Sequence, residues 1–210
     1  AYAFRGYNTT NLGRSNELLR HSTYRPVVEE KLRQAAACCK TITGKPVDLV
    51  KRVEEERETD LSSYDEAVAL IVAMELAQIE LLEVFFDIRL QSGRLCFGYS
   101  LGEIVALAAS GVLNMEDALS VPLSLAEDCV GLAKNVTLGI LLSRGTALSV
   151  EEVLRGCLRI NAEGNGVVGP SAFLSPNSML LMGQHDTLDR LQSWLKENHP
   201  GQTSLRKNKQ

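Results

Sequence analysis

A serine between two glycines is the residue whose surroundings best suit covalent chemistry. Ser100 lies in "FGYSLG", a G-x-S-x-G pattern with Gly98 and Gly102 on either side. In a nucleophile elbow a strand turns sharply into a helix, and the turn lifts the serine hydroxyl clear of the sheet. Glycines are expected there because side chains would collide with neighbouring backbone. The competing interpretation is a strand-to-helix turn that happens to contain serine.

The sequence around Ser100 predicts the two elements that an elbow needs. Residues 94–98 form a short apolar segment typical of a strand, and 101–110 are rich in small apolar residues and precede Gly111, a typical helix end. The N-terminus of that helix directs backbone N–H groups at the serine, so the Leu101 N–H is expected to stabilise an oxyanion.

The remaining elements are read from hydrophobic periodicity and from capping and turn residues. Residues 51–60 are so rich in charge that a solvated helix or loop is expected there. The other elements expected in the first part are a strand at 1–4, helices at about 26–40 and 64–88, and a helical stretch at 114–134 that Pro122 should kink or break.

The last third changes to a different order of elements. Its sequence predicts β-α-β-β-α-β, the split βαβ or ferredoxin-like unit. The expected strands are about 137–143, 168–174, 179–183 and 202–207, and the expected helices are 149–159 and 184–199.

Composition narrows the possible partners. The 210 residues are 45% hydrophobic and 23% charged, as in a globular protein with a core. The net charge of −4 favours neither nucleic acid nor an anionic membrane. The longest uncharged apolar run, 67–74, is too short to span a bilayer, and no signal-peptide pattern opens the chain. Five cysteines without disulfide-framework or zinc-ligand spacing indicate a reducing compartment, so we expect a cytoplasmic protein without a metal site.

A longer stretch, 98–119, resembles a known family of acyltransferases. The shared pattern is G-H-S-x-G-E, an alanine-rich helix, and then G-x-(L/I)-x-x-E-D-A. This family moves acyl groups from coenzyme A to acyl carrier protein and includes malonyl-CoA:acyl-carrier-protein transacylases and the acyltransferase domains of polyketide and fatty-acid synthases. Residues 174–183 are similar to its N-S-P-x-Q-x-V-(I/L)-x-G segment.

The resemblance implies an α/β fold, with an α/β-hydrolase-like core over 1–135 and an inserted ferredoxin-like subdomain over 136–207. It implies that Ser100 forms an acyl-enzyme whose oxyanion is bound by the backbone N–H groups of Leu101 and Tyr7. Tyr7 stands where the family has the first Gln of P-G-Q-G-S-Q, and Tyr99 replaces the usual His before the nucleophile, in the substrate pocket.

The implied reaction is ping-pong. An acyl-CoA acylates the serine, and the phosphopantetheine thiol of an acyl carrier protein then takes the acyl group. No permanently bound cofactor is implied.

One departure from the family concerns the acyl group. Malonyl and methylmalonyl enzymes of the family carry an Arg that pairs with the free carboxylate, and counting places Leu125 at that position. Glu127 and Asp128 would repel a carboxylate. A monocarboxylic acyl group is therefore expected.

The alternative is that Pro122 remodels this helix and shifts the count by several residues. Arg144 and Arg155 would then remain as distant substitutes for the family's Arg.

A second departure concerns the general base. None of the three histidines, His21, His185 and His199, stands where the family has its catalytic His. That residue, with the C-terminal part of the core, is expected a few residues beyond Gln210, and true loss is the alternative.

Two hypotheses about function follow: an acyltransferase, or a degenerate, non-catalytic module with a structural or docking role. A hydrolase on the same elbow is disfavoured because the E-D-A extension belongs to the transferases.

Overall fold

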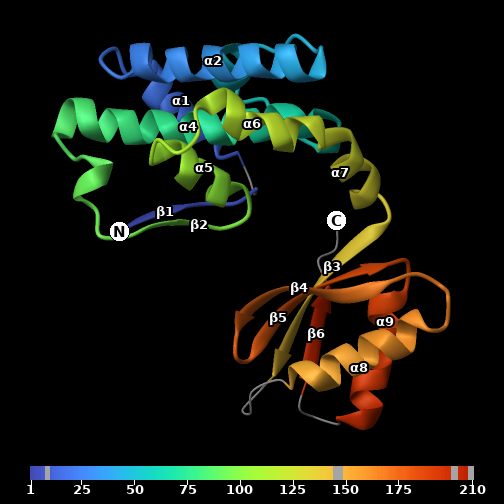
Figure 1. The fold of residues 1–210 in the computed structure, drawn as a ribbon. Coiled ribbons are helices and arrows are strands. Elements are labelled where there is room, and N and C mark those ends of the chain that lie inside the picture. The colour runs from blue at the N-terminus through green and yellow to red at the C-terminus, as the bar shows by residue number, and fades with distance from the viewer. Residues whose placement is uncertain (8–9, 144–148, 200–202, 208–210) are drawn as a thin grey trace. The chain divides into compact units, whose positions relative to one another are not determined.

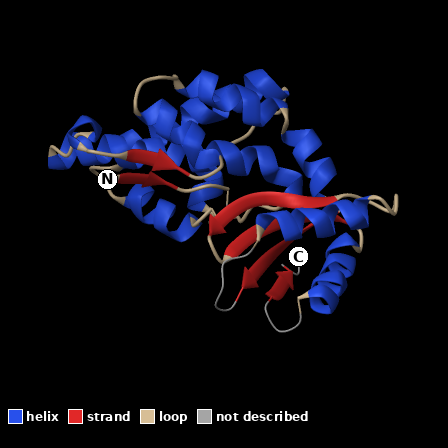
Figure 2. Ribbon diagram, turned by 60° about the horizontal axis from the view of Figure 1, so that its bottom comes forward, coloured by secondary structure: helices blue, strands red, loops and turns tan. Residues whose placement is uncertain are grey.

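The computed structural model describes residues 1–7, 10–143, 149–199 and 203–207. The chain has an α/β fold and divides into two compact units, Ala1–Val130 and Gly131–Gln210 (Figure 1). Each unit contains both helices and strands (Figure 2).

A pair of helices forms the centre of the first unit. The expected helices appear as α2 (Arg25–Thr43) and α4 (Tyr64–Phe86), which pack against each other (Figure 1). Residues 67–75 of α4 are buried without interruption. Other elements surround this stretch on all sides, which explains the continuous apolar sequence. The smaller helices are α1 (Leu12–Arg20), α3 (Leu49–Glu54), α5 (Leu101–Ala109), α6 (Met115–Ser124) and α7 (Ala126–Ala133), with 3-10 turns η1 (Leu61–Ser63) and η2 (Leu90–Ser92).

Two parallel strands position the loop that follows each of them. β1 (Tyr2–Phe4) pairs with β2 (Cys96–Gly98), with Phe4 opposite Gly98. Because parallel strands end at the same edge of a sheet, the loop after β1 lies beside the turn between β2 and α5. The structure therefore confirms the predicted strand–turn–helix at Ser100 and adds a second loop next to it.

The predicted break at Pro122 is confirmed. Pro122 lies inside α6, which ends at Ser124, and Leu125 separates α6 from α7. Proline has no N–H to donate and its ring crowds the preceding turn, so a helix rarely runs past it undisturbed.

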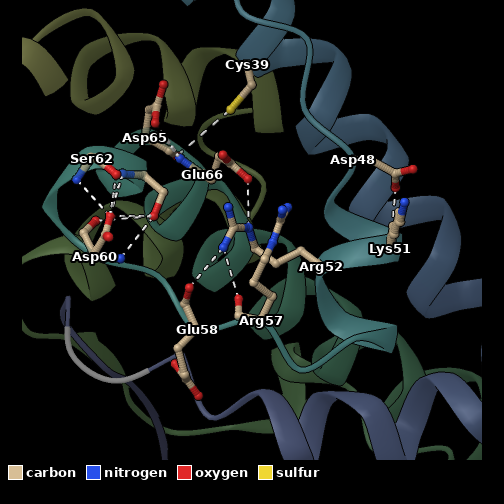
Figure 3. A network of polar contacts seen from close by, with 11 residues as sticks. Cys39, Asp48, Lys51, Arg52, Arg57, Glu58, Asp60, Ser62, Asp65 and Glu66 are labelled. Atoms are coloured by element: carbon tan, nitrogen blue, oxygen red, sulfur yellow. Dashed lines mark hydrogen bonds and ion pairs between the residues drawn. The ribbon is translucent and has the colours of Figure 1, made fainter.

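The expectation of a solvated segment at 51–60 is wrong for Arg52. Its side chain is only 6% exposed and donates from Nε to Glu66 Oε2 at 2.7 Å. Nη1 donates to the carbonyls of Arg57 and Glu58 at 2.9 and 3.1 Å, and Figure 3 shows the guanidinium between these groups. The arginine thereby joins α3, the connecting loop and the first turn of α4. Charge density alone did not reveal that one cation of this segment faces inward.

The second unit is a four-stranded antiparallel sheet covered by two helices. The order of strands is β4-β5-β3-β6, and the chain passes through them as β3-α8-β4-β5-α9-β6. Side chains of α8 and α9 share one core with alternate residues of the strands, including Leu141, Met179 and Leu181. The elements are β3 (Val136–Ser143), α8 (Val150–Asn161), β4 (Val168–Ser175), β5 (Ser178–Gln184), α9 (Thr187–Asn198) and β6 (Thr203–Lys207).

Replacing Arg52 with Met should destabilise the first unit. The substitution leaves Glu66 and two carbonyl groups without their donor, and breaking a buried ion pair from one side costs roughly 3 kcal/mol. The neighbouring Lys51→Met is the matched control, because Lys51 is 64% exposed and its ion pair with Glu55 should contribute no more than about 0.5 kcal/mol. Urea unfolding measures both, and equal small losses would contradict the structural role of Arg52.

Candidate nucleophile elbow and oxyanion site

Ser100 adopts a backbone conformation that residues with a side chain rarely take. Its φ is +56° and its ψ is −120°, and the residue is exposed between β2 and α5. Such a conformation costs roughly 1–3 kcal/mol and persists only where the surroundings impose it. This geometry is the strained turn that a nucleophile elbow requires, and it presents the side chain to solvent.

The two glycines of the pattern are required by backbone contacts. A Cβ at Gly98 would lie 2.0 Å from the Gly102 carbonyl oxygen and 2.3 Å from the Glu103 nitrogen. A Cβ at Gly102 would lie 2.2 Å from the Phe4 carbonyl oxygen and 2.6 Å from that of Arg5. Backbone atoms cannot rotate away as a side chain can, so no larger residue fits at either position.

Two backbone N–H groups belong to the turn at Ser100 and to the loop that packs against it. Leu101 is the first residue of α5, so its N–H has no acceptor within the helix. Gly6 packs against the same turn: a Cβ there would lie 2.7 Å from the Tyr99 carbonyl oxygen and 3.1 Å from Ser100 Cβ. Tyr7 follows directly, and among the described residues its N–H has no recorded acceptor.

Two carboxylates that sequence reasoning did not select support this turn. Glu103 Oε1 accepts the Ser100 N–H at 3.2 Å, which fixes the first turn of α5. Glu75 Oε1, from α4, accepts the Arg5 N–H at 2.9 Å. Signals were present for both, since Glu103 follows the G-x-S-x-G pattern directly and Glu75 ends an uninterrupted apolar run.

The Tyr7 ring packs against another tyrosine. The Tyr7 and Tyr64 rings lie 4.8 Å apart between centroids. Burial, together with the nearby Cys129 and Tyr7, raises the pKa of Tyr64 to about 12, so its hydroxyl stays protonated. Burial, with a smaller effect of the Asp60 charge, raises the pKa of Tyr7 as well. Leu125 lies one turn before Cys129, on the same side of α7, and is 48% exposed.

Glu127, which is expected to repel a carboxylate, is 87% exposed, and its Oε1 lies 3.3 Å from Lys45 Nζ. Lys45 Nζ also lies 3.8 Å from Asp65 Oδ2, so one cation faces two carboxylates and the local charge stays negative. The expected repulsion therefore stays a prediction. Of the two distant substitutes, Arg155 lies on α8 in the second unit, and Arg144 lies outside the described residues.

The histidines occupy other parts of the fold. His21 stacks on Tyr24 at the turn between α1 and α2, with ring centroids 4.0 Å apart. His185 and His199 belong to the second unit, where His199 lies 3.8 Å from Glu152. Within the described part of the chain, none of the three forms a hydrogen bond with Ser100.

The described residues contain no helix long and apolar enough to cross a membrane. They also contain no group of three or more His, Cys, Asp or Glu side chains arranged to hold a metal ion.

Known proteins similar to this chain are polyketide synthases in sequence and acyltransferases in fold. No family model matches the chain. A reducing polyketide synthase of Cochliobolus heterostrophus is 32% identical over 147 residues, which are 69% of this chain and 6% of that protein. A highly reducing polyketide synthase of a fungal species is 28% identical over 198 residues, 93% of this chain and 7% of that protein.

Solved structures point to the same class. A malonyl-CoA:acyl carrier protein transacylase of Xanthomonas oryzae has a TM-score of 0.68 at 23% identity, covering 98% of this chain and 60% of that one. A loading acyltransferase from the avermectin polyketide synthase has a TM-score of 0.66 at 22% identity, with coverage of 98% and 60%. The chain thus has the fold of these acyltransferases.

The family resemblance is confirmed: homologues are polyketide synthases, and structural neighbours are acyltransferases. Together they fit a divergent acyltransferase domain of the polyketide synthase type. The chain spans 6–7% of the synthases' length and about 60% of the two structures' length.

Substituting alanine for Gly98 or Gly102 should disrupt the elbow. Each added Cβ must displace backbone, so the free energy of unfolding should fall by more than about 3 kcal/mol or the protein should fail to fold. Gly13→Ala is the matched control: Gly13 lies in α1 and a Cβ there would have no atom within 4 Å. Alanine favours a helix by about 1 kcal/mol over glycine, so this variant should be as stable or more stable. Thermal unfolding distinguishes these results, and a stable Gly102→Ala variant would refute the close approach.

Proposed function

We propose that this chain transfers acyl groups by way of an ester on Ser100, in the manner of the acyltransferases whose fold it shares. The observation that supports this most directly is the conformation of Ser100, at φ +56° on a strand-to-helix turn that ends in a helix N-terminus. Glycine would adopt this conformation without strain, so a serine here keeps its side chain at an energetic cost, as expected of a residue with a chemical role.

The proposed first step is acylation by an acyl-CoA. Ser100 Oγ attacks the thioester carbonyl, its proton passes to a base, and the carbonyl oxygen becomes an oxyanion. The N–H groups of Leu101 and Tyr7 would bind this oxyanion in the transition state, where such donors have their largest effect. The carbon–sulfur bond then breaks, and coenzyme A leaves as a thiol after taking a proton.

In the second step a phosphopantetheine thiol attacks the serine ester. The thiol gives up its proton, the new thioester forms, and Ser100 regains a proton on Oγ. An acyl carrier protein is the proposed owner of this thiol, and no resident cofactor takes part in either step.

The preferred acyl group is proposed to be monocarboxylic, such as acetyl or a longer chain. The Tyr7 and Tyr64 rings pack together, Cys129 interacts with the Tyr64 hydroxyl, and Leu125 precedes Cys129 by one helical turn. None of these four side chains is a cation that could pair with a carboxylate. Lys45, the cation nearest to Glu127, is already paired with two carboxylates. A free carboxylate buried beside these side chains would lack a partner, which is unfavourable.

For the fold, we propose an α/β-hydrolase-like core with a ferredoxin-like subdomain over 136–207. The order β4-β5-β3-β6 of the second unit supports this assignment. A cytoplasmic location also remains a proposal.

The test uses intact-mass analysis after incubation with acetyl-, malonyl- and longer acyl-CoA. One acyl adduct per chain should form, should transfer to free pantetheine, and should be absent from Ser100→Ala. Ser110→Ala is the control, because Ser110 is an exposed serine just after α5 that has no proposed role. Absence of any adduct, or an adduct that persists in Ser100→Ala, would refute the proposal and favour a non-catalytic module.

Leu125→Arg should move the preference toward malonyl-CoA. A guanidinium that pairs with the free carboxylate is worth about 1.5–3 kcal/mol, so the ratio of malonyl to acetyl acylation rates should rise at least about tenfold. Leu125→Met keeps an uncharged side chain at position 125 and should leave the ratio of malonyl to acetyl acylation rates unchanged. A wild-type protein that accepts malonyl faster than acetyl would contradict the proposed preference.

A further inference from the structure

Glu75 is a buried carboxyl in the most apolar part of the first unit. It is 9% exposed and follows residues 67–74 of α4, all of them buried. Burying a carboxyl is costly unless its oxygens are hydrogen-bonded or paired. One oxygen of Glu75, Oε2, is buried and has no hydrogen-bond partner among the described residues. Burial of the Glu75 carboxyl is therefore only partly compensated by hydrogen bonds.

The other oxygen holds a backbone group. Oε1 accepts the Arg5 N–H at 2.9 Å and lies 3.9 Å from Arg5 Nε. Burial raises the pKa of Glu75, while the Arg5 N–H and the Arg5 charge act against this rise. Arg5 is the first residue after β1, so Glu75 fixes the point at which this strand becomes a loop.

The same stretch of backbone is held from its other side by the elbow. The Tyr99 N–H donates to the Phe4 carbonyl at 3.2 Å. The carbonyls of Phe4 and Arg5 also lie so close to Gly102 that a Cβ there would be 2.2 and 2.6 Å away. The peptide groups of residues 4 and 5 are thus enclosed between α4 and the Ser100 turn.

Tyr7 lies two residues beyond this enclosed point, past Gly6, where an added Cβ would lie 3.1 Å from Ser100 Cβ. Because only Gly6 separates Tyr7 from Arg5, holding the Arg5 peptide limits the directions that the Tyr7 N–H can take. We propose that Glu75 is a positioning residue, which accepts the Arg5 N–H and thereby directs the Tyr7 N–H at the oxyanion formed on Ser100. This inference rests on the function proposed above, because it assigns Glu75 a role in the same acylation step.

Two substitutions separate positioning from simple packing. Glu75→Gln keeps a side-chain oxygen that can accept the Arg5 N–H, whereas Glu75→Met has a similar size and no such acceptor. Glu80→Met is the matched control on the same helix, since Glu80 pairs with Lys31 at 2.7 Å and touches neither loop. The full chain is used throughout, and melting temperatures confirm that each variant is folded.

Two readouts are needed, the single-turnover rate of Ser100 acylation by acetyl-CoA and the hydrogen exchange of the Arg5 amide. Removing one oxyanion donor lowers enzyme rates about 10²–10³-fold, so misdirecting one in Glu75→Met should slow acylation about tenfold or more. The Arg5 amide should also exchange faster in that variant. Glu75→Gln and Glu80→Met should stay within about threefold of the wild-type rate, with the Arg5 amide still protected.

Other outcomes would overturn the assignment in distinguishable ways. If the wild type is acylated and Glu75→Met is acylated equally fast, Glu75 has no positioning role and the proposed function stands. The same holds if Glu75→Gln is as slow as Glu75→Met, or if the Arg5 amide exchanges alike in all variants. If the wild type itself forms no acyl-enzyme, the proposed function fails and this assignment fails with it.

Discussion

Backbone contacts closer than any side chain would allow hold the end of β1 against the turn at Ser100. The carbonyl groups of Phe4 and Arg5 lie too close to Gly102 for any side chain there, and the backbone of Gly102 and Glu103 lies equally close to Gly98. These contacts explain why glycine stands at both positions and why Ser100 is forced to a positive φ. They also place the loop of Gly6 and Tyr7 beside the serine. The position of the Tyr7 ring beside that of Tyr64 depends on the same approach.

The supports of this contact come from elements that are distant in sequence. Glu75 on α4 binds the Arg5 N–H, and Arg5 Nη2 reaches the Thr10 carbonyl at 3.3 Å. Thr10 Oγ1 in turn donates to Glu58 at 2.9 Å, and the carbonyl of Glu58 is bound by Arg52 (Figure 3). A line of polar contacts therefore runs from the buried arginine of α3 to the loop beside Ser100. These contacts restrain that loop, as the proposed oxyanion site would require.

The parts of the site that are local in sequence could be predicted from it. The elbow, its glycines, the following helix and the break at Pro122 depend on residues within a few positions of each other, and their sequence signals are strong. The acyltransferase resemblance extended these signals over most of the chain. The order of elements in the last third was also readable, because each has a clear periodicity.

Contacts between distant residues could not be predicted in the same way. The bond between Glu75 and Arg5 joins residues 70 positions apart, and nothing in either segment specifies the other. In the sequence Arg52 is one of many charged residues in its segment, whereas in the fold Glu66 and the carbonyls of Arg57 and Glu58 bind its buried guanidinium. Glu127 pairs with Lys45, 82 positions away in the sequence, and neither segment indicates the other. In each case the partner, rather than the residue itself, decides the role.

The central claim is that the turn makes Ser100 a nucleophile, and labelling with a serine-directed fluorophosphonate tests it without any assumption about the acyl donor. Peptide mapping of the labelled protein should locate the probe on Ser100, at a rate at least about tenfold above that of Ser110, an exposed serine near the end of α5. Labelling of Ser100 no faster than Ser110, or a label that remains after Ser100→Ala, would contradict the claim.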